Sequence, residues 1–214
     1  MSLFAQLTAF DPNFIDLTVP QAMVLGLLVY LVCLPLRFRR LGWRRNVWVA
    51  LLFVYAGAVV SLTLLPIPLR GFSISWENTN WQLSSINWLP LQSIRQMWEN
   101  SGIAGSYKEF TRIVGGNFVM LLPLGILAPL VCQKLRWPHM LALAAGTPVV
   151  IEGLQLVENL LFGSLNVVEI DDFILNSAGC LLGYVLFLLF RAAGATATAG
   201  TGKRKRKRKG KRGR

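Results

Sequence analysis

The sequence predicts an all-α fold, a polytopic membrane helix bundle with about five transmembrane helices, the N-terminus outside and the C-terminus inside. Of the 214 residues, 54% are hydrophobic and only 15% are charged. The mean hydropathy is +0.50, so the chain is far more apolar than a soluble domain of this length needs to be. Five apolar runs are each close to the ~20 residues that cross a ~30 Å hydrocarbon layer. Lys and Arg gather in alternate connecting loops, which sets the orientation.

The first two apolar runs cover about 19–36 and 47–65. Five arginines crowd the loop RFRRLGWRR between them, and the second run ends at LPIP, where Pro66 and Pro68 cannot continue a helix. No Lys or Arg precedes the first run and no small-residue cleavage site follows it. We therefore expect the first run to remain in the mature protein, because a cleaved signal peptide needs both features.

Residues 67–111 are of mixed polarity and form a Trp-rich extracytoplasmic loop with Trp76, Trp81, Trp88 and Trp98. Tryptophan at this density is typical of a segment that lies at the level of the lipid headgroups. A small folded unit with a tryptophan core is the alternative, and the sequence leaves both open.

Three more apolar runs follow, at about 113–132, 138–162 and 172–190. The loop QKLRWPH and the C-terminal end are basic, whereas the N-terminus and the loop GSLNVVEI contain no Lys or Arg. This asymmetry places the C-terminus inside. We expect a single transmembrane domain over residues 1–190, with Pro123 and Pro129 bending the third run because each removes a backbone donor.

The stretch EIDDFILNSAGCLLGY, residues 169–184, organises the rest of the chain. On a helix, one stripe about 60° wide contains Asp172, Asn176, Gly179 and Gly183. Polar groups on a membrane helix usually face a protein interior or a water-filled site. The small residues favour close packing, so we expect this stripe to pack against the third and fourth runs.

The predicted topology places polar residues of the last three runs at a similar depth, in the outer half of the membrane. The candidate ligand-binding residues are Asn117, Glu152, Gln155, Asp171, Asp172 and Asn176. A buried glutamate costs about 2.5–3.5 kcal/mol in a membrane helix. The simpler alternative is that Glu152 is protonated, or hydrogen-bonded to Asn117 or Asn176, and only holds the helices together.

Several motifs in this order resemble the VanZ-like family of bacterial membrane proteins. They are NFVMLLPLGILAPL at 117–130, IEGLQL at 151–156 and the stretch at 169–184, with weaker matches in LTLLP and NWLPLQSI. Many members carry an arginine shortly before the acidic motif, where this chain has Asn166 or its neighbours. The resemblance implies a multi-pass protein of the bacterial plasma membrane, acting in the cell envelope and associated with low-level resistance to the glycopeptide teicoplanin. It implies no defined reaction.

Three functions remain open at this point. The first is a non-enzymatic protein that binds a lipid-linked cell-wall precursor or a glycopeptide at the polar site. The second is an enzyme acting on a lipid-linked substrate, with Asp171 and Asp172 holding a divalent cation and Glu152 as acid or base. The third is a small transporter with Glu152 as a proton-coupled carboxylate, although no internal repeat supports it. We expect no required cofactor, and whether the protein is an enzyme is undecided, since the common hydrolase and nucleotide-binding motifs are missing.

The chain ends in a basic tail. Ten of its Lys and Arg lie in KRKRKRKGKRGR, residues 203–214. Such a segment cannot bury a core, so we expect residues 191–214 to be disordered and cytoplasmic. Besides the surrounding membrane lipids, its expected partners are anionic lipid headgroups, at ~1 kcal/mol per basic residue, and we expect no specific nucleic acid. The alternative is that the tail only reinforces orientation.

Overall fold

The computed structural model describes residues 14–35, 41–68, 74–163 and 166–211, with side chains as far as Gly194. The fold is all-α, as predicted, apart from a two-residue antiparallel pair of strands, β1 (Phe14–Ile15) and β2 (Ile67–Pro68). The helices, in chain order, are α2 (Val19–Cys33), α3 (Trp43–Leu64), α4 (Trp76–Ser84), α5 (Gln92–Ala104), α6 (Lys108–Met120), α7 (Leu122–Val131), α8 (Trp137–Phe162) and α9 (Ile170–Lys211).

Each predicted apolar run falls on a helix or a helix pair. Within the described ranges, the segments long and apolar enough to cross a membrane are Trp43–Leu64, Lys108–Val131, Trp137–Phe162 and Ile170–Gly194, and Val19–Cys33 is a shorter apolar helix of 15 residues. These helices show a membrane helix bundle. The exact number of spans and the orientation stay predictions.

The third apolar run is broken, as its prolines predict. The break lies at Leu121 between α6 and α7, with φ −95° and ψ 2°, and Pro123 stands in the first turn of α7. Proline has no N–H to donate and its ring crowds the preceding turn, so the helix cannot pass through undisturbed. The hydroxyl of Tyr55 on α3 donates to the carbonyl of Met120 at 2.8 Å, which supplies a donor at the break. By contrast, Pro129 lies inside α7 without ending it.

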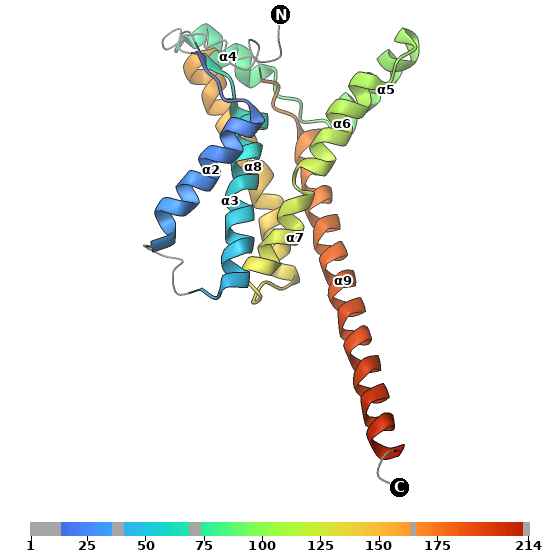
Figure 1. The fold of residues 1–214 in the computed structure, drawn as a ribbon. Coiled ribbons are helices and arrows are strands. Elements are labelled where there is room, and N and C mark those ends of the chain that lie inside the picture. The colour runs from blue at the N-terminus through green and yellow to red at the C-terminus, as the bar shows by residue number, and fades with distance from the viewer. Residues whose placement is uncertain (1–13, 36–40, 69–73, 164–165, 212–214) are drawn as a thin grey trace, which may run out of the picture.

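α9 packs against α6, α7 and α8, and its contact with α6 and α7 is backbone to backbone. A Cβ added at Gly179 would lie 1.8 Å from the carbonyl oxygen of Phe118, and one at Gly183 would lie 2.1 Å from that of Leu122. Gly125 of α7 faces the backbone of α9 in the same way. Figure 1 shows α6 and α7 running beside α9. The predicted packing of the glycine stripe is therefore present in the fold.

The buried apolar core lies between α7, α8 and α9 and consists of Leu121, Ala128, Met140, Ala144, Ile151, Cys180 and Tyr184. The hydroxyl of Ser177 on α9 donates to the carbonyl of Ala144 on α8 at 2.9 Å. Polar contacts of this kind hold helices together where the surrounding lipid is as apolar as the core.

The Trp-rich segment folds into α4, α5 and the start of α6, and it does not form a tryptophan core. Trp76, Trp81, Trp88 and Trp98 are 81%, 54%, 68% and 53% exposed. Trp98 contacts the rings of Tyr107 and Phe110 with centroids 4.6 and 5.2 Å away. Exposed indole rings favour the position at the lipid headgroups over the alternative of a tryptophan-centred unit.

α9 continues as a helix to Lys211, through most of the segment for which the sequence predicts disorder. Alanine, lysine and arginine are strong helix formers, and the apolar part of α9 provides the nucleus from which they extend. Figure 1 shows this part of α9 pointing away from the other helices. The domain boundary at residue 190 and the role of the tail stay predictions.

We predict that Gly179→Ala destabilises the bundle by about 1–3 kcal/mol, because the new methyl group overlaps the backbone of α6. Gly153→Ala on α8 is the matched control, since a Cβ there meets nothing within 4 Å. Thermal unfolding of the two purified variants in detergent measures the difference. Equal melting temperatures for both variants and the wild type would contradict the close packing of α9 on α6.

Candidate functional site

The start of α9 is joined to the segment that precedes α5. The N–H of Asn87 donates to the carbonyl of Val168 at 3.1 Å, and the N–H of Ile170 donates to the carbonyl of Asn87 at 3.0 Å. This pairing forms a parallel bridge between Asn87 and Glu169. Two stretches about 80 residues apart in the chain, NWLPLQSI and EIDDF, are thereby fixed to one another.

Asp171 strengthens this junction from the first turn of α9. Its side chain is 1% exposed. One carboxylate oxygen accepts the N–H of Leu91 and the other accepts the N–H of Ile94, the latter at 3.1 Å. These N–H groups belong to the beginning of α5, where a helix leaves its donors unpaired and favours a negative charge. Asp171 therefore positions α5, and both of its oxygens are engaged within the protein.

Asp172 faces a different neighbour from Asp171, because successive residues on a helix point about 100° apart. The side-chain amide of Asn117 on α6 donates to the carboxylate of Asp172. The close approach of α6 and α9 at Gly179 makes this reach short. The sequence places these two residues at one depth, and the structure brings them into contact.

Glu152 on α8 completes a junction of three helices. Its carboxylate lies close enough to those of Asp172 and Glu169 for their charges to repel one another. The Oε2 atom of Glu152 is buried, and no described residue donates a hydrogen bond to it.

Asn176 lies one helical turn deeper than Asp172 on the same stripe of α9. It is 1% exposed, and its Oδ1 atom is likewise buried without a donor from the described part of the chain. A buried acceptor without a donor costs about 1–3 kcal/mol, so most such atoms have a partner. We call the set Asn117, Glu152, Asp172 and Asn176 the three-helix cluster.

Gln155, the remaining candidate, lies outside the three-helix cluster. Its side-chain amide donates to the carbonyl of Thr63 in the last turn of α3 at 2.8 Å. The final carbonyls of a helix have no partner within the helix, so this bond stabilises the end of α3. Gln155 thus connects α8 to α3.

Two hollows flank α5, on opposite faces of the helix. One of about 680 Å³ is mostly apolar and is lined by Leu89, Pro90, Leu91, Gln92, Ile94, Arg95, Trp98 and Phe110. The other, of about 430 Å³, is called the polar hollow because most of its lining residues are of polar types; they are Ser93, Gln96, Met97, Asn100, Ser101, Ala104, Ser106, Glu109 and Glu169. Glu169 belongs to the wall of the polar hollow and also lies near Glu152, so this hollow adjoins the three-helix cluster.

Comparison with known families decides what kind of protein carries this arrangement. The model of the VanZ/LLP1 family matches residues 52–191, well over half of the chain. The chain belongs to the VanZ/LLP1 family. The resemblance inferred from the motifs is therefore confirmed, and the protein is a VanZ-like membrane protein. No curated protein and no solved structure matches it.

The VanZ/LLP1 match includes Asn166, which stands where the resemblance led us to expect an arginine. Here the side-chain amide of Asn166 donates to Glu158 at 3.4 Å. Asn159 fixes the backbone of Asn166 from both sides, donating to its carbonyl at 2.6 Å and accepting its N–H at 3.2 Å. An uncharged amide thus stands beside a buried carboxylate, and the loop before α9 is held by α8.

Three residues that matter for the site were not among the candidates from sequence. Asn87 and Glu169 act through contacts between distant segments, and Asn159 acts on the loop before α9. One sign of their importance is visible in the sequence: each is a polar residue inside or beside an apolar run.

The two adjacent aspartates do not face one common point. Asp171 and Asp172 turn to different partners, the backbone of α5 and the amide of Asn117. Among the residues that the structure describes, no three His, Cys, Asp or Glu side chains are grouped so that they could hold a metal ion. That the protein requires no cofactor stays a prediction.

We predict that Asp171→Asn loosens the start of α5. The new amide sets an N–H group against backbone N–H donors, and the loss of a charged hydrogen bond costs about 1.5–3 kcal/mol. Hydrogen exchange at the amides of Leu91 and Ile94 should accelerate by about tenfold or more. Glu99 is exposed on the same helix, so Glu99→Gln should leave the exchange rates of these two amides unchanged. Equal protection in Asp171→Asn and wild type would show that Asp171 does not hold α5.

Proposed function

We propose that this VanZ-like membrane protein binds a lipid-linked or glycopeptide-type ligand of the bacterial cell envelope through the three-helix cluster. The observation that carries the proposal is the pair of buried acceptors, Glu152 Oε2 and Asn176 Oδ1, to which no described residue donates. Glu152 lies on α8 and Asn176 on α9, the helix that the Asn117–Asp172 hydrogen bond joins to α6.

The chemistry of the cluster selects the kind of group that it would bind. Glu152, Asp172 and Asn176 offer acceptor oxygens, so the matching ligand presents N–H or O–H donors. Glycopeptides and lipid-linked cell-wall precursors both carry peptide amides and sugar hydroxyls. Negative groups of a ligand, such as phosphates, would lie away from the cluster, because Glu152, Asp172 and Glu169 already repel one another.

The polar hollow beside α5 supplies a route from the surface to the cluster. Glu169 is shared between the wall of the hollow and the carboxylates of the cluster. Asp171, although a candidate for ligand contact, would serve this route by holding α5 in place. With the predicted orientation, the hollow opens to the outside of the plasma membrane, where a glycopeptide acts, and binding there would raise tolerance to teicoplanin.

Asp171 and Asp172 contact different partners, which favours a ligand-binding protein over a metal-dependent enzyme. A cation centre needs several oxygens converging on one point, whereas Asp171 is used for α5 and Asp172 for α6. The transporter remains the weaker reading, because a single carboxylate such as Glu152 serves a binding site equally well.

We predict that Glu152→Gln and Asp172→Asn each return a tolerant strain to the teicoplanin sensitivity of cells without the protein. Both changes keep the side-chain shape and replace an acceptor oxygen with a donor, which faces the ligand's own donors. The measurement is the minimal inhibitory concentration, together with the amount of each variant in the membrane fraction.

Glu77→Gln is the control, since Glu77 is exposed on α4. If both cluster variants are present in the membrane at wild-type amounts and keep full tolerance, the cluster is structural and the proposal fails.

A further inference from the structure

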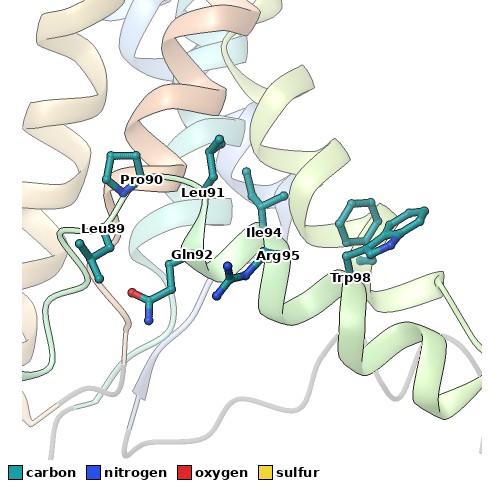
Figure 2. A pocket seen from close by; sticks show the side chains of 8 residues that line it. Leu89, Pro90, Leu91, Gln92, Ile94, Arg95 and Trp98 are labelled. Atoms are coloured by element: carbon teal, nitrogen blue, oxygen red, sulfur yellow. The ribbon is translucent and has the colours of Figure 1, made fainter.

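The apolar hollow beside α5 has a feature that the three-helix cluster does not use. Ile94, Arg95 and Trp98 are spaced i, i+1 and i+4, so they lie on the same side of α5, and Leu91 comes directly before the helix. Figure 2 shows these side chains along the loop and first turns of α5, with Leu89 and Pro90 in the loop that leads into the helix. One cationic side chain therefore stands within a row of apolar ones.

The apolar side chains around this hollow are open to their surroundings. Leu89 is 62% exposed, Leu91 58% and Trp98 53%. Apolar groups gathered on a surface mark a site where another apolar body is bound. The segment belongs to a membrane protein and carries exposed indole rings, which prefer the headgroup region of a bilayer. In that region, the apolar group available to bind there is the acyl chain of a lipid.

The backbone holds this surface in a fixed shape. Leu91 has φ 64°, a left-handed conformation that a leucine adopts only at a cost. The hydrogen bond from its N–H to the buried Asp171 maintains that conformation. The side chain of Leu91 lines the hollow and is exposed.

Arg95 is the cation among the residues that line the hollow. Its side chain is 73% exposed, and its contact with Glu99 is 3.7 Å long. An exposed pair at that distance binds weakly, so the guanidinium keeps N–H donors for another acceptor. A guanidinium matches the geometry of a phosphate group, which it binds through two parallel hydrogen bonds.

We propose that this hollow binds an anionic, phosphate-bearing membrane lipid. The acyl chain packs against Leu89, Leu91 and Trp98, and the phosphate accepts hydrogen bonds from Arg95. This lipid site is separate from the three-helix cluster, on the opposite face of α5 from the polar hollow. The inference does not depend on which ligand the cluster binds.

The experiment is native mass spectrometry of the full chain in detergent, titrated with dioleoyl phosphatidylglycerol, dioleoyl phosphatidylcholine or glycerol 3-phosphate. We expect phosphatidylglycerol to bind more tightly than phosphatidylcholine, and glycerol 3-phosphate, which has no chains, to bind far more weakly. Arg95→Gln should weaken phosphatidylglycerol binding about tenfold.

Arg112→Gln is the matched control for charge. Arg112 lies on α6, is 69% exposed and pairs with Glu109 at 2.6 Å, so it is similar in exposure but does not line the hollow. It should have no effect on lipid binding. The basic tail is present in every variant, so its own attraction to anionic lipids is the same in all comparisons.

A second pair of variants tests the chain contact. Leu89→Asn should weaken the binding of both lipids several-fold, whereas Ile103→Asn should not, because Ile103 is 87% exposed on α5 but does not line the hollow. If Arg95→Gln and Arg112→Gln lose phosphatidylglycerol binding equally, the effect comes from the net charge of the protein and not from the hollow. Equal binding of glycerol 3-phosphate and phosphatidylglycerol would show a phosphate site without a lipid. Either result overturns the proposal, and neither bears on the three-helix cluster.

Discussion

The arrangement of the polar residues depends on the backbone contact between α9 and the broken helix formed by α6 and α7. Gly179 and Gly183 leave no side chain between the helices, and the carbonyls of Phe118 and Leu122 occupy the space that a Cβ would need. Because the axes approach this closely, Asn117 reaches Asp172 across the interface. Any larger residue in the stripe would separate the two.

Burying a carboxylate in a membrane bundle is unfavourable. In this protein, different kinds of contact compensate different carboxylates. Asp171 is satisfied by the backbone of α5, and Asp172 receives the amide of Asn117. Glu158 and Asn159 hold the loop before α9. Glu152 on α8 and Asn176 on α9 retain buried acceptors without a donor from the described residues.

The contact between EIDDF and NWLPLQSI gives α5 a fixed position at the end of the bundle. Backbone pairing at Asn87 and the carboxylate of Asp171 act together on the loop that begins α5. α5 then separates a polar hollow that adjoins the cluster from an apolar hollow that contains Arg95. One short helix therefore forms a wall of both surfaces.

Sequence reasoning predicted those features that local chemistry determines. Apolar length identified the membrane helices, proline placed the break before Pro123, and helical periodicity placed Gly179 and Gly183 on the face that packs. It also brought Asn117 and Asp172 to one depth.

It could not predict the contacts between distant segments. Asp171 and Gln155 were selected for a ligand site, but their partners lie 77 to 92 residues away in sequence, and only the packed structure selects them. Glu169 was missed because it precedes the predicted span.

Ligand binding by the purified protein is the most direct test of the role of the three-helix cluster. The chain, reconstituted in lipid nanodiscs, would be titrated calorimetrically with teicoplanin and with a lipid-linked cell-wall precursor. We expect one of them to bind saturably, with Asn176→Ala reducing the affinity at least tenfold and Glu77→Gln leaving it unchanged. Affinity that is the same in wild type, Asn176→Ala and Glu77→Gln, or no binding of either ligand by the wild type, would contradict a binding role for the cluster.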